Sequence, residues 1–276
     1  MILSAAEARG LLAELGRAPA SARLDLARAA LLFATVDSGE ADLAAALAHL
    51  EEMAEAAAAM GPAAEGDSAA AAAGLAGLLA EHFGYLGDSE TYDDLANANL
   101  LRVIERRRGL PVALGILWIH AARAAGFEAK GANMPAHFLV GLDAGSGPVI
   151  LDPFDRGRIV SIEELGQRLA AIEPEGGEFV LRPMTDRDVL LRLENNVWQR
   201  RAKAGDVAGA LAVLEDMALL APEEPYILRE AARLHYEIGS LRGAIACLER
   251  LLPLAPDLET ARGTRALIEE LKAKLN

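Results

Sequence analysis

The sequence predicts an α+β protein that is mostly helical, and three patterns along its 276 residues support this. Residues 1–90 carry apolar side chains at helical spacing. Residues 111–159 change from one apolar helix to short strand-like runs. The last third repeats its own pattern every 34 residues. We therefore expect a helical region at 1–90, a core with a small antiparallel sheet at 91–184, and helical repeats at 185–276.

Residues 1–90 are expected to be all helical. Apolar side chains recur at helical spacing over about 21–38, 41–60 and 68–83, with Ser21 as the N-cap of the first helix and Gly61-Pro62 ending the second. Runs of Ala fill much of this region, and Ala favours the helix more than any other residue.

An acidic segment, Asp88–Asp94, follows these helices and has two interpretations. It could bind a metal, but it lacks the ligand spacing and the terminal Glu of a calcium loop. Asp and Ser ahead of a helix are also ordinary capping residues. We favour capping of a helix over about 94–107 and predict no metal site here.

The core is predicted to be one buried helix, about 111–125, packed on a small sheet. The helix is apolar on most sides, which is typical of a buried helix. Pro111 suits its first turn, and Gly126 ends it. Short strands are expected at 127–132, 136–142 and 149–151, with a turn at 145–148. Beyond them we expect a short helix at 162–169, a strand at 179–181, and a long helix from Thr185 or Asp186 to about 204.

The final third contains an internal repeat. Gly205, Ala210 and Pro222 recur as Gly239, Ala244 and Pro256, each 34 residues later. This period, with Gly between the helices, Ala at their crossing and Pro after the second, is typical of tetratricopeptide repeats. We expect two repeats over about 191–257 and a capping helix at 258–275. Because two repeats alone are marginal, the array should pack on preceding residues.

Candidate chemistry centres on His137, in the second predicted strand, and Asp152, at the end of the third. Asp152 could fix the tautomer of His137 and leave the imidazole as a base, or the two could form a structural hydrogen bond. Asp152 could also cap the turn that Pro153 begins. Asn133 could polarise a carbonyl or satisfy a turn.

Two stretches carry a family resemblance. Residues from Arg106 read RRRGLPVALGILWIHAARAAGFEAKGANMPAHFLV, and ILDPFDRG follows from Ile150. Together with the repeats, they resemble the transglutaminase-like, tetratricopeptide-repeat proteins of the SirB-one type, over about residues 90–260. The resemblance implies a transglutaminase-like, papain-like core with a cleft beside the start of the buried helix. We assign Gly109, Pro111, Asn133 and Phe138 to that cleft.

The resemblance also implies what is missing. In the papain-like and transglutaminase-like enzymes, a Cys at the start of the helix is the nucleophile, the His accepts its proton and the Asp orients the His. Here residues 109–113 contain no Cys, Ser or Thr, and Pro111 and Val112 occupy the position of the nucleophile. The one Cys, Cys247, falls within a repeat helix and is expected to be a packed apolar residue.

The composition limits the partners. The net charge is −14, which opposes binding to a phosphate backbone, and we expect no nucleic-acid partner. Arg102, Arg106, Arg107 and Arg108 form the one basic cluster and are expected to neutralise the end of a helix. We find no membrane-spanning run and expect no signal peptide. A single Cys agrees with a cytoplasmic location.

The leading hypothesis is a non-catalytic, regulatory interaction protein, in which a degenerate cleft and an acidic helical array bind a protein or peptide. The alternative is a peptide or amide hydrolase or transferase in which His137 and Asp152 act with water or a bound metal. A third is a scaffold with a closed cleft. We predict no cofactor, and the sequence does not define an oligomeric state.

Overall fold

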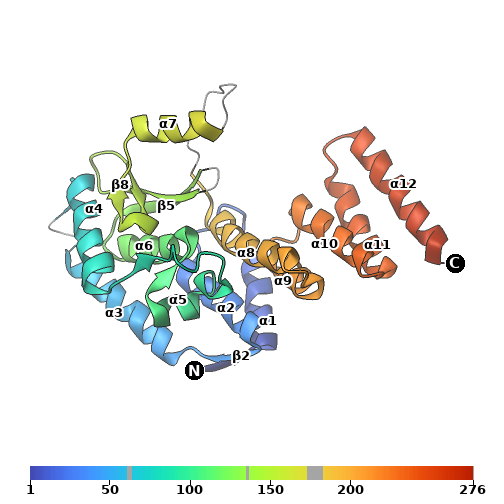
Figure 1. Cartoon of the computed structure of the whole chain (residues 1–276), viewed down its shortest axis with the longest axis horizontal. Helices are drawn as coiled ribbons and strands as arrows, with labels where there is room; N and C mark the ends of the chain where they lie inside the picture. The colour runs from blue at the N-terminus through green and yellow to red at the C-terminus, as the bar shows by residue number, and fades with distance from the viewer. Residues whose placement is uncertain (61–63, 135–136, 173–182, 276) are drawn as a thin grey trace. The chain divides into compact units, whose positions relative to one another are not determined.

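A computed structural model describes residues 1–60, 64–134, 137–172 and 183–275 (Figure 1). It divides into two compact units, one made of residues 1–8 and 19–193 and the other of residues 9–18 and 194–276. Both contain many helices, and the first also contains the sheet, as the predicted fold class requires. The three-part division at residues 90 and 184 stays a prediction.

The N-terminal helices of the first unit form near their predicted positions. They are α2 (Leu26–Ser38), α3 (Ala44–Met60), α4 (Ser68–Ala76) and the π-helical turn η2 (Gly77–His82). Ser21 is not a cap: α2 begins later, where the Asp25 side chain accepts a hydrogen bond from the backbone N–H of Arg28. Gly61-Pro62 lies outside the described residues.

This region is not all helical. Strands β1 (Ile2–Ser4) and β2 (Glu40–Asp42) pair antiparallel, although 36 or more residues separate each pair in the chain. Strand β3 (Leu86–Gly87) pairs in parallel with β4 (Arg108–Gly109). These strands are two or three residues long, too short to show a period of two in the sequence.

The acidic segment is a hydrogen-bonded turn that Arg106 fixes. Asp88 accepts the backbone N–H groups of Glu90 and Thr91 and the hydroxyl of Thr91, while Arg106 Nη2 lies 3.2 Å from its Oδ2. Buried Asn97 donates to the Thr91 carbonyl. The predicted helix is therefore split into a 3-10 turn, η3 (Leu95–Asn97), and α5 (Leu100–Arg106).

The Arg cluster does more than neutralise a helix end. Arg106 binds Asp88, whereas Arg107 contacts His49 and the Tyr85 hydroxyl. These contacts join α5 to α3 and to the loop before β3.

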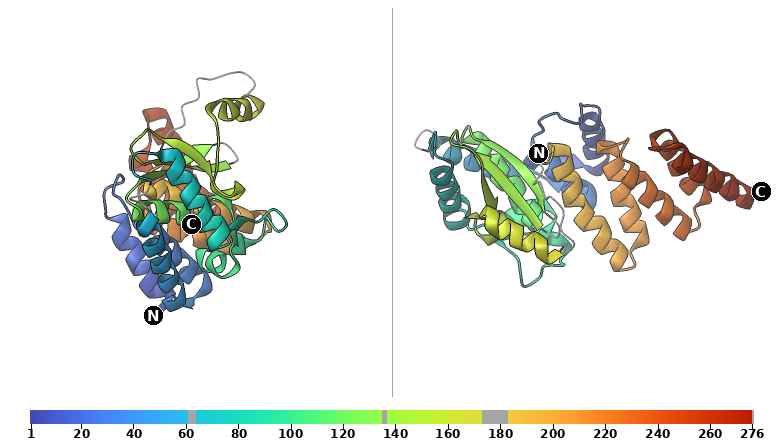
Figure 2. Two further views of the ribbon diagram at one scale, coloured as in Figure 1. Left: turned by 90° about the vertical axis from the view of Figure 1, so that its left-hand side faces the viewer. Right: turned by 90° about the horizontal axis from the view of Figure 1, so that it is seen from above.

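The core of the first unit is α6 (Pro111–Ala124), packed on a four-stranded antiparallel sheet. Its strands, in spatial and chain order, are β5 (Glu128–Met134), β6 (His137–Asp143), β7 (Val149–Asp152) and β8 (Arg158–Ile159). Helix α7 (Ile162–Ile172) follows β8. Figure 1 and the left view of Figure 2 show the sheet between α6 and α7. The predicted strand at 179–181 lies outside the described residues.

A buried ion pair closes this core. Arg123, in the last turn of α6, binds both carboxylate oxygens of Asp186 at 2.8 and 2.6 Å, and Asp186 Oδ2 also accepts the backbone N–H of Leu24. Arg123 donates further to the carbonyls of Leu24 and Ala129. The pair thus joins α6, β5, the segment before α2 and the start of α8 (Asp186–Lys203), which Thr185 caps.

The second unit is the repeat array with one helix from the N-terminus. The array contains the part of α8 from Glu194 on, α9 (Val207–Leu220), α10 (Pro225–Glu237), α11 (Leu241–Leu251), the turn η5 (Leu252–Leu254) and α12 (Leu258–Leu275). From Arg9 on, α1 (Ala5–Gly16) belongs to this unit: Arg9 binds Asp216 at 2.6 and 3.2 Å, and Gly16 lies against the Leu219 carbonyl. Cys247 packs on the apolar cluster of α10, α11 and α12, as expected.

We expect Asp186→Asn to lower the free energy of unfolding by about 3 kcal/mol, because Arg123 would keep a buried charge without its counter-charge. Urea unfolding followed by circular dichroism measures this change. Arg28→Gln is the control, because its ion pair with Asp25 is exposed and should contribute less than about 1 kcal/mol. Equal losses in the two variants would contradict a special role for the buried pair.

We also expect Asp88 to make stability depend on pH. The hydrogen bonds from the Thr91 side chain and backbone lower the pKa of Asp88 from 3.8 to about 2, against the effect of burial. Between these values the unfolded chain binds more protons, so stability should fall as the pH falls from about 4 to about 2. The difference between wild type and Asp88→Asn in urea unfolding should shrink over that range. A difference that stays constant with pH would refute this assignment.

Candidate functional site

His137 and Asp152 meet at the end of the sheet. His137 begins β6 and Asp152 ends β7, and His137 Nε2 lies 2.8 Å from Asp152 Oδ2. The imidazole is 22% exposed, whereas the carboxylate is 4% exposed. A carboxylate at this distance fixes the neutral imidazole with its proton on Nε2, which leaves the Nδ1 lone pair available. The two residues paired in the sequence hypothesis are therefore in contact.

Asp152 also caps a turn, so the two interpretations of this residue hold together. Its Oδ1 accepts the backbone N–H groups of Phe154 and Asp155, at the start of the 3-10 turn η4 (Pro153–Asp155). Burial acts to raise the pKa of Asp152, but the hydrogen bond and charge of His137 and the two backbone N–H groups hold that pKa below 3.8. Oδ1 of the carboxylate thus caps the turn, and Oδ2 contacts His137.

The DPFDRG motif serves the packing of this turn. The Phe154 ring lies on Gly87, where a Cβ would come within 2.6 Å of it. Gly157 has a φ of +75° and lies against the Trp118 ring of α6, which would contact any side chain at this position. The motif therefore packs the end of the sheet against α6 through the contact of Gly157 with Trp118.

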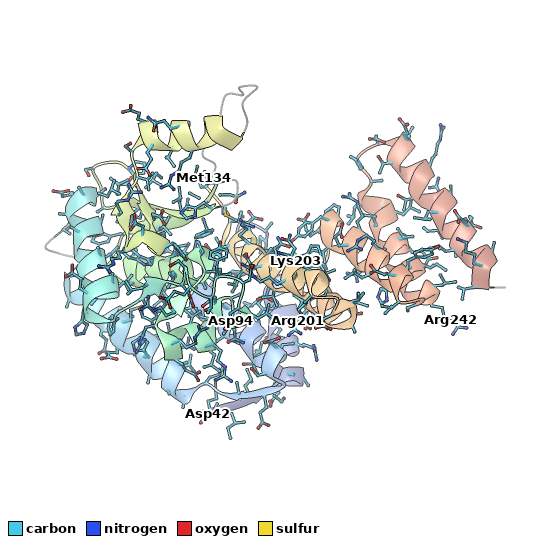
Figure 3. The ribbon with its side chains drawn as sticks, viewed as in Figure 1. Asp42, Asp94, Met134, Arg201, Lys203 and Arg242 are labelled. Atoms are coloured by element: carbon cyan, nitrogen blue, oxygen red, sulfur yellow. The ribbon has the colours of Figure 1, made fainter. Side chains whose placement is uncertain are left out.

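The two faces of β6 point to different helices. Successive side chains of a strand alternate between faces. Phe138 packs on Gly115 of α6, and Val140 shares its face. His137 and Leu139 share the opposite face, where Leu139 clusters with Met134 and with Leu165 of α7. Met134, the register partner of His137, lies between the sheet and α7 (Figure 3).

The start of α6 is filled with apolar side chains. Leu110 and Ala113 are fully buried, Val112 is 2% exposed, and Pro111 is also buried. Gly109 lies 3.0 Å from the Val103 methyl groups, measured from the position of an added Cβ. No polar side chain occupies residues 109–113.

The remaining residues assigned to the cleft, Asn133 and Phe138, lie opposite each other on β5 and β6 but differ in burial. Phe138 is 2% exposed and belongs to the core between α6 and the sheet, because Gly115 and Gly131 leave room for its ring. Asn133 is exposed on β5. Of the assigned residues, the structure brings His137 and Asp152 into direct contact.

Sequence reasoning missed three charged residues beside the pair. Arg168 of α7 places Nη1 3.7 Å from Asp152 Oδ2 and donates to Glu164 Oε1 at 2.6 Å. Arg158 of β8 binds both oxygens of Glu164 at 2.7 and 2.9 Å and donates to Asp155 at 2.7 Å. The hydrogen bond from Arg158 lowers the pKa of Glu164 to about 2, so Glu164 is charged at neutral pH. The spacing of Glu164 and Arg168, four residues apart in a helix, was the available signal.

The described part of the chain contains no group of three or more His, Cys, Asp or Glu side chains placed to hold a metal ion. Within the same residues, we find no helix long and apolar enough to cross a membrane.

A 630 Å³ pocket lies at the C-terminal end of α6, lined by residues such as Ala124, Phe127 and Asp143.

Known proteins share this organisation. Residues 44–195 match the family described as the transglutaminase-like superfamily, and residues 199–269 match the tetratricopeptide repeat. A UPF0162 protein of Xylella fastidiosa is 31% identical over 201 residues, which are 70% of this chain and 71% of the relative. A UPF0162 protein of Vibrio cholerae is 29% identical over 196 residues, covering 65% and 68% of the two chains.

A more distant relative is the human F-box only protein 21, which is 23% identical over 177 residues, or 59% of this chain and 27% of that protein. The matched family, the two bacterial relatives and the repeats agree with the resemblance carried by the sequence motifs. The chain therefore belongs to the transglutaminase-like superfamily, together with the UPF0162 proteins, and carries C-terminal tetratricopeptide repeats.

Proposed function

We propose that this chain is a non-catalytic interaction protein that binds a protein or peptide through its repeats, with a regulatory role in the cytoplasm. The main support is the start of α6, where a transglutaminase-like enzyme would carry its nucleophile. Pro111, Val112 and Ala113 are buried there and offer no group that attacks a carbonyl.

The repeat array supplies a surface for a partner. Helix α10 buries Ile227, Leu228, Ala231, Ala232 and Leu234. It exposes Arg229, Arg233 and Tyr236, which recur at helical spacing along one face. An exposed aromatic ring beside Arg side chains is a composition enriched at protein interfaces. Arg233 is held by Glu230 and Glu237, so its side chain is ordered before binding.

The distribution of charge changes the expected partner. Residues 1–193 contain 16 Lys and Arg against 28 Asp and Glu, a net charge of −12. Residues 194–276 contain 11 and 13, a net charge of −2. The helical array is therefore weakly acidic, and most of the negative charge belongs to residues 1–193. The α10 face does not select a basic partner. Glu230 and Glu237 already bind Arg233, so Arg229 is the side chain of this face that suits a partner with a carboxylate.

We expect the double variant Arg229→Glu, Tyr236→Ala to lose the partner that the full-length wild type retains from cell extract, by about tenfold or more in quantitative mass spectrometry. His137→Gln should retain as much of it as wild type. Lys130→Glu, an exposed change on β5, is the control for altered charge. Loss in His137→Gln with retention in the double variant would transfer the function to the His137–Asp152 pair.

The alternative, a hydrolase or transferase, is favoured by one observation, the 2.8 Å contact that leaves His137 Nδ1 as a possible base. Its nucleophile would be water or a group of the partner. The two proposals can be separated by placing a Cys at the start of α6 and measuring whether its thiol is reactive.

We expect a Cys at position 112 to be unreactive. In Val112→Cys the thiol should be alkylated by iodoacetamide at about pH 7 no faster than Cys247, whose pKa burial raises. Mass spectrometry of the two peptides compares the rates within one chain. Alkylation about tenfold faster than at Cys247, with loss of that advantage on adding His137→Gln, would show that His137 can act as a base toward the start of α6, which would favour the alternative.

A further inference from the structure

One carboxylate oxygen serves both His137 and Arg168. Asp152 Oδ1 is used by the backbone N–H groups of the turn, so Oδ2 alone faces the two side chains. His137 Nε2 lies 2.8 Å from it and Arg168 Nη1 lies 3.7 Å from it. The carboxylate is 4% exposed, so these neighbours replace most of the water that would otherwise solvate its charge.

Arg168 is itself held from the other side. Its second nitrogen, Nη2, donates to Glu164 Oε1, and Glu164 also binds Arg158 through both oxygens. Arg158 returns to the turn through Asp155. The ion pairs therefore run from Asp152 through Arg168, Glu164 and Arg158 to Asp155. Because Asp155 follows Asp152 by three residues, the chain itself closes the ring.

This path attaches α7 to the sheet. The apolar contact of α7 in the described residues is Leu165, which packs with Met134, Leu139 and Val160. Arg168 lies one turn further along α7, where it reaches the sheet through Asp152. The charged residues around His137 come from three directions. Asp152 and Asp155 lie on β7 and η4, Arg158 lies on β8, and Glu164 and Arg168 lie on α7. The neighbour of His137 on β5 is Met134, which is uncharged.

We propose that Arg168 is a positioning residue for His137: it keeps Asp152 Oδ2 in line with Nε2, and it ties the pair to helix α7. A charged, fixed acceptor at Nε2 keeps the imidazole proton on that nitrogen. Without Arg168, the buried carboxylate depends on His137 and two backbone donors, and the orientation of Oδ2 is no longer fixed from the α7 side. This coupling does not depend on whether the repeats bind a protein.

The test is long-range ¹H–¹⁵N NMR of the imidazoles in the full chain at about pH 8, where an ordinary imidazole is neutral. The spectrum of His137→Gln identifies the His137 signals among the five histidines. We expect wild type to show the tautomer with the proton on Nε2. Arg168→Gln should raise the fraction of the other tautomer several-fold, and Arg168→Lys should restore most of the wild-type pattern.

Arg102→Gln is the matched control, because Arg102 forms an exposed ion pair with Glu105 of α5 and its loss should leave the His137 signals unchanged. Arg168 is 33% exposed, so its replacement by Gln does not create a buried vacancy. A merely structural role would lower the thermal midpoint and leave the tautomer unchanged. An identical His137 pattern in wild type and Arg168→Gln would overturn the proposal.

The tie to α7 has its own measurement. Backbone amides of α7 should exchange with deuterium several-fold faster in Arg168→Gln than in wild type, whereas amides of α6 should exchange at the wild-type rate. Unchanged exchange in α7 would overturn the tie, whatever the tautomer of His137.

Discussion

The burial of α6 determines how the rest of the first unit is built. Every residue from Pro111 to Ile119 is buried, so this part of the helix has no face free for polar groups. Its neighbours approach closely where a glycine makes room, as Gly115 does for Phe138 and Gly157 does for Trp118. Its charged side chain, Arg123, lies in the last turn and forms an ion pair with Asp186. A polar nucleophile at its start would have to be buried in the same apolar surroundings.

The sequence predicted the features whose signals are local. The apolar run of α6, the Pro at its start and the Gly after its end all lie within 16 residues. The repeats are visible because their helices recur with the same turn residues. The pairing of His137 with Asp152 followed from strand order, since neighbouring antiparallel strands bring their opposite ends together.

The features that the sequence did not reveal depend on distant contacts. Helix α1 joins the repeat array through Arg9 and Asp216, which are 207 residues apart. The face of β6 that meets α6 was also undetermined, because both sets of alternating residues contain large apolar side chains. The structure resolves this: Phe138, not His137, contacts α6, and the charged network of α7 adjoins the pair.

Asp152 is explained by the fold before any chemistry is considered. It caps the turn that places Phe154 on Gly87, and its carbonyl accepts the N–H of Gly157. A substitution at Asp152 would therefore disturb packing and the imidazole together, and its effect could not be attributed to either. Arg168 has no part in the turn and reaches the same carboxylate from α7. A substitution at Arg168 leaves in place the hydrogen bonds that Asp152 Oδ1 accepts from the turn, so its effect on the imidazole can be measured apart from the packing of that turn.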